Sequence, residues 1–217
     1  MSFAPDTADY TRSELAADRL VHITGLCLGI AGALVILSVA APAGAGIAIA
    51  CAIYAASLVA MLVCSAAYHL ARTSTRRVLL RRLDHAAIFL LIAGTYTPFT
   101  TCRLHGAWAV GMTAGVWLGA LAGIAIKLMS PHRLIGVSTA LYLALGWIIL
   151  IGLKPIIAAL DPTTLELLGL GGIVYSTGAL VHNWRSLRFH NVIWHAMVVV
   201  AAACHYAAII HGVVLAG

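Results

Sequence analysis

The sequence predicts an all-α, polytopic membrane protein, folded as a bundle of seven transmembrane helices, and three observations predict it. Hydrophobic residues make up 62% of the 217 residues, charged residues make up 9%, and the mean hydropathy is +1.01. A soluble domain carries about 25% charged residues, so 13 Lys and Arg and seven Asp and Glu are too few to cover a water-facing surface. The apolar residues also fall into seven long runs. These observations exclude a soluble enzyme, a disordered chain and a disulfide scaffold.

Each apolar run is long enough to form a membrane span, since a helix needs about 20 apolar residues to cross the hydrocarbon core. We expect the spans at roughly residues 20–40, 47–70, 83–101, 107–129, 134–153, 165–182 and 192–215. The connections are short and rich in Pro and Gly, which favour turns. The spans form one domain over residues 20–217. It follows a polar cytoplasmic segment at residues 1–19, which has no apolar core and is therefore no cleavable signal peptide.

The basic residues indicate how the predicted bundle is oriented. Eleven of the 13 Lys and Arg residues lie in the N-terminal segment or between spans two and three, four and five, and six and seven. Only Arg103 and Lys154 lie on the other side. Positive charge stays on the cytoplasmic side, so we expect the N-terminus inside and the C-terminus outside. The net charge of +6 therefore reflects orientation in a membrane and not nucleic-acid binding.

Polar residues from four predicted spans reach one depth near the cytoplasmic surface. Ser65 and His69 lie four residues apart and share a helix face. A lone buried acid such as Asp84 costs about 2.5–3.5 kcal/mol in a membrane, which a metal or a cation would offset. Imidazole and carboxylate without paired thiolates suit Zn²⁺. The histidines at this depth are His22 in span one, His69 in span two, His85 in span three, and His190 and His195 in span seven.

Simpler roles exist for every one of these residues. His69 fits a membrane interface beside Tyr68, and Asp84 could pair with Arg81 or Arg82. The remaining histidines fit interfacial positions or hydrogen-bonded packing; they are His105, His132, His182, His205 and His211. The shared depth, and no single residue, favours a metal site.

Several sequence blocks resemble the hemolysin III branch of the progestin and adipoQ receptor (PAQR) superfamily. The longest is DHAAIFLLIAGTYTPF at 84–99, and the others are SAAYH at 65–69, LYLALGW at 141–147, GGIVYSTG at 171–178 and IWHAMVVVAAACHY at 193–206. The resemblance extends from about Glu14 to the end of the chain. It implies a seven-helix bundle in a bacterial plasma membrane, with the N-terminus inside and a zinc site on the cytoplasmic side.

The resemblance also implies roles for individual residues. His69 and His195 match zinc ligands, and Asp84 and Ser65 match groups near the metal-bound water that either support the ligands or take part in catalysis. The third ligand would fall at position 191, where this chain has Asn191. We therefore take His190 as the third ligand, although five residues turn an ideal helix by about 140°. His85 and His205 are the alternatives.

The family's first motif is altered here as well. Asp18 stands where Asn is usual, and Glu14 lies one residue from the usual position of the Glu. Glu14, Asp18 and His22 recur every four residues and form one polar stripe on a helix. The stripe fits an interfacial helix face as well as it fits a part in the site.

These inferences lead us to expect a zinc-dependent hydrolase of lipid amides or esters, which the resemblance relates to alkaline ceramidases. Its substrate would be a membrane lipid. The alternatives are a pore-forming, cytolytic protein and a non-catalytic regulator of membrane lipids with structural zinc. No predicted span has the stripe of charges that usually marks an ion pathway. Water at the fourth zinc position favours the enzyme, and a fourth protein ligand favours the structural role. A continuous water-filled path through the bundle favours the pore.

Overall fold

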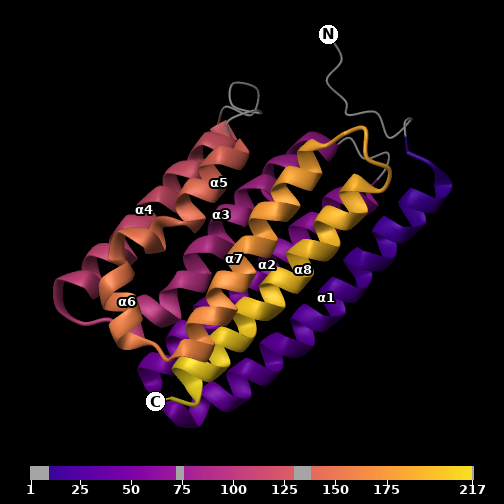
Figure 1. Cartoon of the computed structure of the whole chain (residues 1–217). Coiled ribbons are helices and arrows are strands. Elements are labelled where there is room, and N and C mark those ends of the chain that lie inside the picture. The colour runs from indigo at the N-terminus through magenta and orange to yellow at the C-terminus, as the bar shows by residue number, and fades with distance from the viewer. Residues whose placement is uncertain (1–9, 72–75, 130–137, 217) are drawn as a thin grey trace.

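A computed structural model describes residues 10–71, 76–129 and 138–216 (Figure 1). These residues form helices and connections, and no strand occurs among them. The α-helices are α1 (Arg12–Ala40), α2 (Ala45–Leu70), α3 (Arg77–Cys102), α4 (Gly106–Met129), α5 (Ser138–Gly146), α6 (Leu153–Ala159), α7 (Pro162–Asn183) and α8 (His190–Ile209). The all-α class predicted from composition is confirmed for this part of the chain.

Six helical segments of the described chain are long and apolar enough to cross a membrane. They are Arg12–Ala43, Ala45–Leu70, Gly106–Met129, Thr139–Ala159, Pro162–Asn183 and His190–Val214. Helix α3 is as long as α2, at 26 residues, but its first turns carry Arg77, Arg81, Arg82 and Asp84. The protein is therefore multi-pass, and the count of seven spans stays a prediction.

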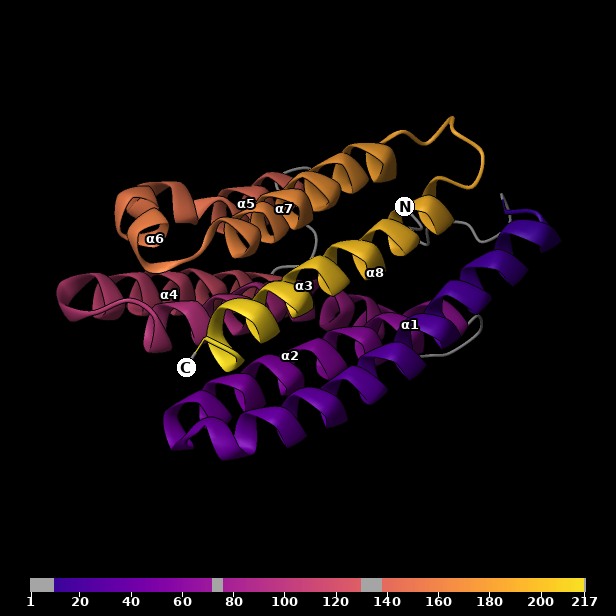
Figure 2. The ribbon, with the colours of Figure 1, turned by 60° about the horizontal axis from the view of Figure 1, so that its bottom comes forward.

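Neighbouring helices in the sequence pack side by side, and α8 returns to contact α1 (Figures 1 and 2). The start of α1, the end of α2, the start of α3, the end of α7 and the start of α8 lie at one end of the bundle (Figure 1). We call this the first end, and the opposite one the second end. The topology thus brings together the polar residues that the sequence places at one depth.

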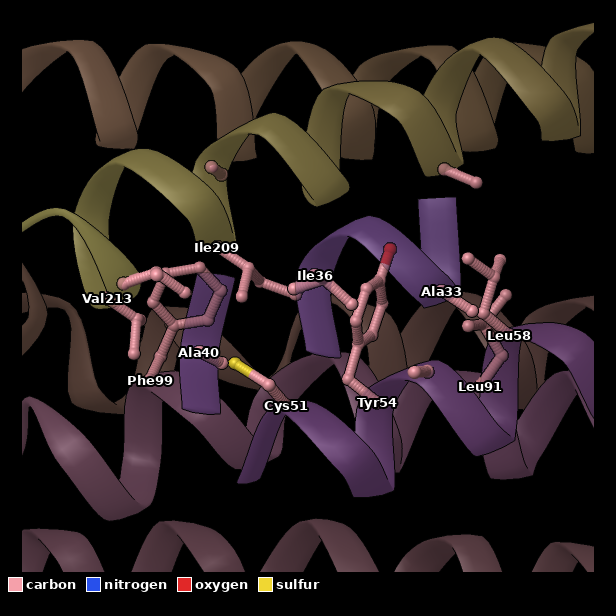
Figure 3. Packing of buried hydrophobic residues seen from close by; sticks show 14 of the residues in the cluster. Ala33, Ile36, Ala40, Cys51, Tyr54, Leu58, Leu91, Phe99, Ile209 and Val213 are labelled. Atoms are coloured by element: carbon pink, nitrogen blue, oxygen red, sulfur yellow. The ribbon is translucent and has the colours of Figure 1, made fainter. Parts of the chain in front are cut away.

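The apolar core lies between α1, α2, α3 and α8 (Figure 3). Tyr54 of α2 and Ile36 of α1 are almost fully buried there against Ile209 of α8. Two glycines of α1 allow close packing, because a Cβ atom at Gly25 would collide with Val199, and one at Gly29 with Leu62. Helix α1 is therefore held close to α2 and α8 along the face that carries His22.

Helix α1 begins at Arg12, eight residues before the expected span, so residues 12–19 of the predicted polar segment are helical. A capping box explains the early start. The Thr11 amide donates to Glu14 Oε2 (2.9 Å), and the Glu14 amide donates to Thr11 Oγ1 (3.3 Å). These bonds satisfy backbone donors that a helix start otherwise leaves open.

The fifth apolar run differs from the single helix expected over residues 134–153. It consists of α5, a 3₁₀ segment at Ile148–Gly152, and α6, which extends to Ala159. Tyr96 of α3 spans the break, because its hydroxyl donates to the Gly146 carbonyl (2.6 Å) and accepts from the Ile149 amide (3.1 Å). Backbone polar groups need such partners in a membrane. The break thus depends on a residue of another helix.

Candidate metal centre

Four side chains that could hold a metal ion meet at the first end of the bundle. Asp18 and His22 come from α1, His69 from the last turn of α2, and His195 from the second turn of α8. The four-residue spacing of Asp18 and His22 places them on one face of α1. One candidate ligand atom from each of the four residues lies within 4.8 Å of the others. Three helices that are distant in sequence therefore contribute to one group, which we call the His/Asp cluster.

The Asp18 carboxylate lies among three imidazole rings. Its Oδ1 atom is 2.7 Å from His195 Nδ1, and its Oδ2 atom is 3.5 Å from His69 Nδ1 and 3.6 Å from His22 Nε2. The ring centroids of His195 lie 4.3 Å from those of both His22 and His69, while His22 and His69 stack at 4.8 Å. Such a packed set of nitrogen and oxygen donors is suited to surround a cation.

The cluster is shielded, and one of its donors lacks a good hydrogen bond. The side chains of His22 and His195 are 6% and 9% exposed, and those of Asp18 and His69 are 13% and 19% exposed. His22 Nε2 is buried, with Asp18 Oδ2 at 3.6 Å and no partner within hydrogen-bond distance. A buried nitrogen without a good hydrogen bond costs up to about 1–3 kcal/mol, and coordination to a metal would offset that cost. The donor set and this atom therefore fit a divalent metal ion.

Ser65 and Asp84 lie beside the cluster as a second polar pair. Both side chains are buried, and the Ser65 hydroxyl is close enough to the Asp84 carboxylate to interact with it. Ser65 lies one turn before His69 on α2, and Asp84 is close enough to His22 and Asp18 to interact electrostatically. The structure thus places the two residues expected to act in catalysis next to the candidate metal ligands.

His190, expected as the third ligand, is not part of the cluster. Its Nδ1 atom is 3.1 Å from the Leu187 carbonyl, and its Nε2 atom is 3.4 Å from the Tyr10 hydroxyl. Helix α8 begins at His190, after Phe189 in a left-handed conformation (φ 61°). A regular helix from that point turns His190 away from His195, because five residues rotate it by about 140°.

The residues of the polar stripe of α1 make contacts in two different places. Asp18 and His22 belong to the cluster, whereas Glu14 Oε1 accepts a hydrogen bond from the Phe189 amide (3.0 Å). Glu14 therefore ties α1 to the connection before α8. Sequence analysis left Asp18 and His22 open as members of the site, and their shared helix face was the signal available for them.

Tyr10, just before α1, contacts two residues at the start of α8, His190 and Asn191. The Asn191 amide nitrogen donates to the Tyr10 hydroxyl (2.8 Å). Burial, with the nearby carboxylates of Asp18 and Glu14, raises the pKa of Tyr10. The hydroxyl therefore stays neutral and can donate a proton in a hydrogen bond to His190.

The other described histidines are not members of the cluster, although His182 is close enough to His195 to interact electrostatically. His85 is near Arg81 and Lys127, and His205 Nε2 is 3.3 Å from the Leu168 carbonyl. The ring of His182 lies tilted against that of Trp194, with the centroids 5.6 Å apart, and His211 contacts Thr164 at the second end. His105 lies exposed just before α4, and His132 falls outside the described residues.

Comparison with known sequences gives one family. The sequence model described as "Haemolysin-III related" matches residues 16–206, a range that contains all four residues of the cluster. The chain is 34% identical to "Hemolysin-3 homolog" of Bacillus subtilis (strain 168) over 198 residues, which are 91% of this chain and 93% of that protein. It is 35% identical to "Hemolysin-3" of Bacillus cereus over 191 residues, or 88% and 87% of the two chains.

A mammalian protein is similar to the chain as well. "Monocyte to macrophage differentiation factor" of Homo sapiens is 28% identical over 168 residues, which cover 72% of this chain and 67% of that protein. No solved structure matches the chain.

Proposed function

This chain belongs to the haemolysin-III-related family of multi-pass membrane proteins, and we propose that it is a zinc-dependent hydrolase of membrane lipid amides or esters. The metal would be held by the His/Asp cluster, with Ser65 and Asp84 as catalytic residues. The substrate would be a lipid whose scissile bond reaches the first end of the bundle.

One observation carries this proposal: the buried Ser65–Asp84 pair lies beside the buried cluster. A metal that only holds helices together needs its ligands and nothing more. A hydrolytic site also needs a group to accept a proton and a donor for the developing oxyanion. The carboxylate of Asp84 and the hydroxyl of Ser65 are groups of these two kinds.

Zinc fits the donor set, and we assign His22, His69 and His195 as its ligands. Imidazole nitrogens are common zinc ligands, and three protein ligands leave a fourth position open in catalytic sites. Asp18 then accepts the His195 Nδ1 hydrogen, as the 2.7 Å contact indicates, and fixes the orientation of that ring. His190, 3.4 Å from the Tyr10 hydroxyl, helps to hold the N-terminal side in place.

Each catalytic group has a definite task in the proposed reaction. When bound, Zn²⁺ supplies Lewis-acid activation of water. Asp84 accepts a proton from the attacking water and later gives it to the leaving amine or alcohol as the carbonyl C–N or C–O bond breaks. The Ser65 hydroxyl turns from Asp84 to the carbonyl oxygen and stabilises its developing negative charge.

The proposed topology places the cluster at a depth that a membrane lipid can reach. We take α3 as a span in addition to the six segments given above, which makes seven, since it packs between α2 and α4. We place the N-terminus in the cytoplasm. The cluster then lies near the cytoplasmic surface, at the level where the headgroup and carbonyl bonds of a bilayer lipid occur. The distribution of Lys and Arg supports this orientation.

Asp18 also gives support to a second candidate function, a structural metal site. Its two oxygens lie within 3.6 Å of nitrogens from all three histidines, so it could serve as a fourth ligand. Four protein ligands are typical of structural zinc sites. In that case the metal would clamp α1, α2 and α8 together in a non-catalytic membrane protein.

The two candidates are separated by one experiment on the purified protein. Zinc content is measured, and release of fatty acid is followed with a ceramide-type amide and a glycerolipid ester. The hydrolase proposal expects bound zinc, measurable release, and an Asp84→Asn variant that keeps zinc but loses about 10²–10⁴-fold in rate. Zinc without hydrolysis, combined with lower thermal stability after chelation, supports the structural clamp. Protein that carries no metal after growth with ample zinc contradicts both.

A further inference from the structure

Helices α3 and α4 bring basic side chains together on the surfaces by which they pack. Arg81, His85 and Phe89 follow one face of α3 at four-residue spacing. Phe89 rests on Gly123 of α4, where a Cβ atom would collide with the ring. Lys127 lies one turn beyond Gly123, so in this antiparallel pair it reaches the level of His85. We call Arg81, His85 and Lys127 the basic site.

Lys127 faces inward although it lies near the end of its helix. It is 5% exposed and continues the buried face formed by Met112, Val116, Ala120 and Gly123. A lysine near the end of a membrane helix usually extends its ammonium group to the interface instead. Lys127 and Arg81 interact electrostatically, and His85 interacts with both. Two cationic groups and an imidazole therefore converge between the two helices.

The acids of the described chain have their hydrogen-bond partners on other sides of the bundle, although Asp84 also interacts electrostatically with Tyr142 of α5. Glu14, Asp18 and Asp84 are engaged with Phe189, His195 and Ser65 on the side of α1, α2 and α8. Asp161 and Glu166 are at the start of α7, at the second end. Lys127 makes further contacts within the protein, so what matters here is the sign of the charge and its inward position.

Two further contacts frame the basic site. Arg82 Nη1 donates to the Leu128 carbonyl (3.3 Å), which ties the start of α3 to the end of α4, and Arg82 Nε is buried without a partner. Tyr142 of α5 donates to the His85 carbonyl (3.1 Å). The site is thus bordered by three helices, and exposed Leu121 and Leu128 lie on the outer surface of α4 nearby.

We propose that the basic site binds the phosphate of an anionic membrane phospholipid, whose acyl chains lie along the outer surface of α4. Arg and Lys are the natural donors to phosphate oxygens, and basic pockets between membrane helices are known to select anionic headgroups. The site is separate from the His/Asp cluster: His85 faces α4, whereas its neighbour Asp84 faces Ser65 of α2. The proposal therefore stands whether or not the protein is a hydrolase.

The test measures binding of phosphatidylglycerol to the full chain in micelles that contain phosphatidylcholine with the same acyl chains. Native mass spectrometry counts the lipids retained. We expect Arg81→Gln and Lys127→Gln each to weaken retention about five-fold, because a basic residue near an anionic surface contributes on that order. Lys127→Arg should retain the lipid, and Arg103→Gln, at the second end, is the charge-matched control.

Each outcome decides for or against the proposal. Selective loss of phosphatidylglycerol in the two Gln variants, with the control unchanged, supports it. Equal retention in all variants overturns it, and so does an equal loss in Arg103→Gln, which would mean general attraction to charge. Complete competition by millimolar inorganic phosphate would identify a site for a soluble anion and would exclude the lipid. If Lys127→Gln does not fold, the half-buried Arg81 carries the test alone.

Discussion

The two ends of the bundle each bring histidine and aspartate together, but in very different surroundings. At the first end, Asp18 lies among three imidazoles whose side chains are at most 19% exposed, and His22 Nε2 has no hydrogen-bond partner. At the second end, Asp161 and His211 are 38% and 48% exposed. Thr164 lies between them there, donating to Asp161 Oδ2 (2.6 Å) and lying 3.1 Å from His211 Nδ1.

This difference shows which histidine–aspartate contacts indicate a binding site. At the second end Asp161 caps α7 and its oxygens have donors within the protein, so the contact is complete without a ligand. At the first end, burial removes water as a partner, and His22 Nε2 has only the Asp18 carboxylate beside it, at 3.6 Å, too far for a good hydrogen bond. Unsatisfied buried donors are rare in folded proteins and call for an explanation. A bound metal ion would supply one at the first end, and none is needed at the second.

The largest effect is expected from removing an imidazole of the cluster. His69→Ala or His195→Ala should abolish metal binding, because two remaining imidazoles hold an ion weakly. Metal content of the purified variants measures this. His211→Ala, at the second end, and His190→Ala, which alters the contact with Tyr10, should both keep the metal. Loss of metal in His190→Ala would instead make His190 a ligand.

Asp18→Asn should have the next largest effect, with metal affinity about 10–100-fold lower, because a carboxylate that orients a ligating histidine contributes on that scale. Competition with a chelator measures the affinity. If Asp18 is a direct ligand of a structural site, the metal should be lost altogether. Asn191→His in the Asp18→Asn background offers an imidazole four residues before His195 and should recover part of the affinity. An unchanged metal affinity in Asp18→Asn would show that Asp18 neither binds the metal nor orients one of its ligands.

Sequence alone predicted much of the first end, for a physical reason. His69, His195, Ser65 and Asp84 reach one depth whenever their helices cross the membrane at the predicted positions. Which side chains face one another depends on how each helix is rotated, and periodicity does not fix that. Asp18 joins the cluster because Gly25 and Gly29 allow α1 to pack closely against α2 and α8.

Two other features depend on contacts between distant residues. The start of α8 is set where Phe189 adopts a left-handed conformation and its amide bonds to Glu14, 175 residues earlier in the chain. This start turns His190 away from the cluster. The break after α5 relies on the Tyr96 hydroxyl of α3. Neither contact leaves a local pattern in the sequence.

A smaller effect is expected midway between the two ends, at the break after α5. Tyr96→Phe removes the hydroxyl that serves both the Gly146 carbonyl and the Ile149 amide, and it should destabilise the protein by about 2 kcal/mol, since unsatisfied backbone groups are costly away from water. Thermal unfolding in detergent measures the loss. Tyr142→Phe is the matched control, because its hydroxyl serves one carbonyl only. Equal losses in both variants would show that the Tyr96 hydroxyl, although it serves two backbone groups, contributes no more to stability than one that serves a single carbonyl.

The smallest effect is expected at the second end, and it depends on pH. The hydrogen bonds that Thr164 donates, together with the electrostatic influence of the nearby His211, hold the pKa of Asp161 below its ordinary value of 3.8. A carboxyl group with a lowered pKa in the folded state stabilises that state above its ordinary pKa, and this stabilisation is lost as the pH falls through the lowered value. Thermal unfolding should therefore show a small acid-dependent loss below about pH 4 that is absent from Asp161→Asn. Because the Asp161 side chain is 38% exposed, water and salt screen its interactions, so the loss should be slight beside the effect of emptying the metal site. An acid-dependent loss of the same size in Asp161→Asn would assign it to carboxylates elsewhere, and the second end would then make no pH-dependent contribution to stability.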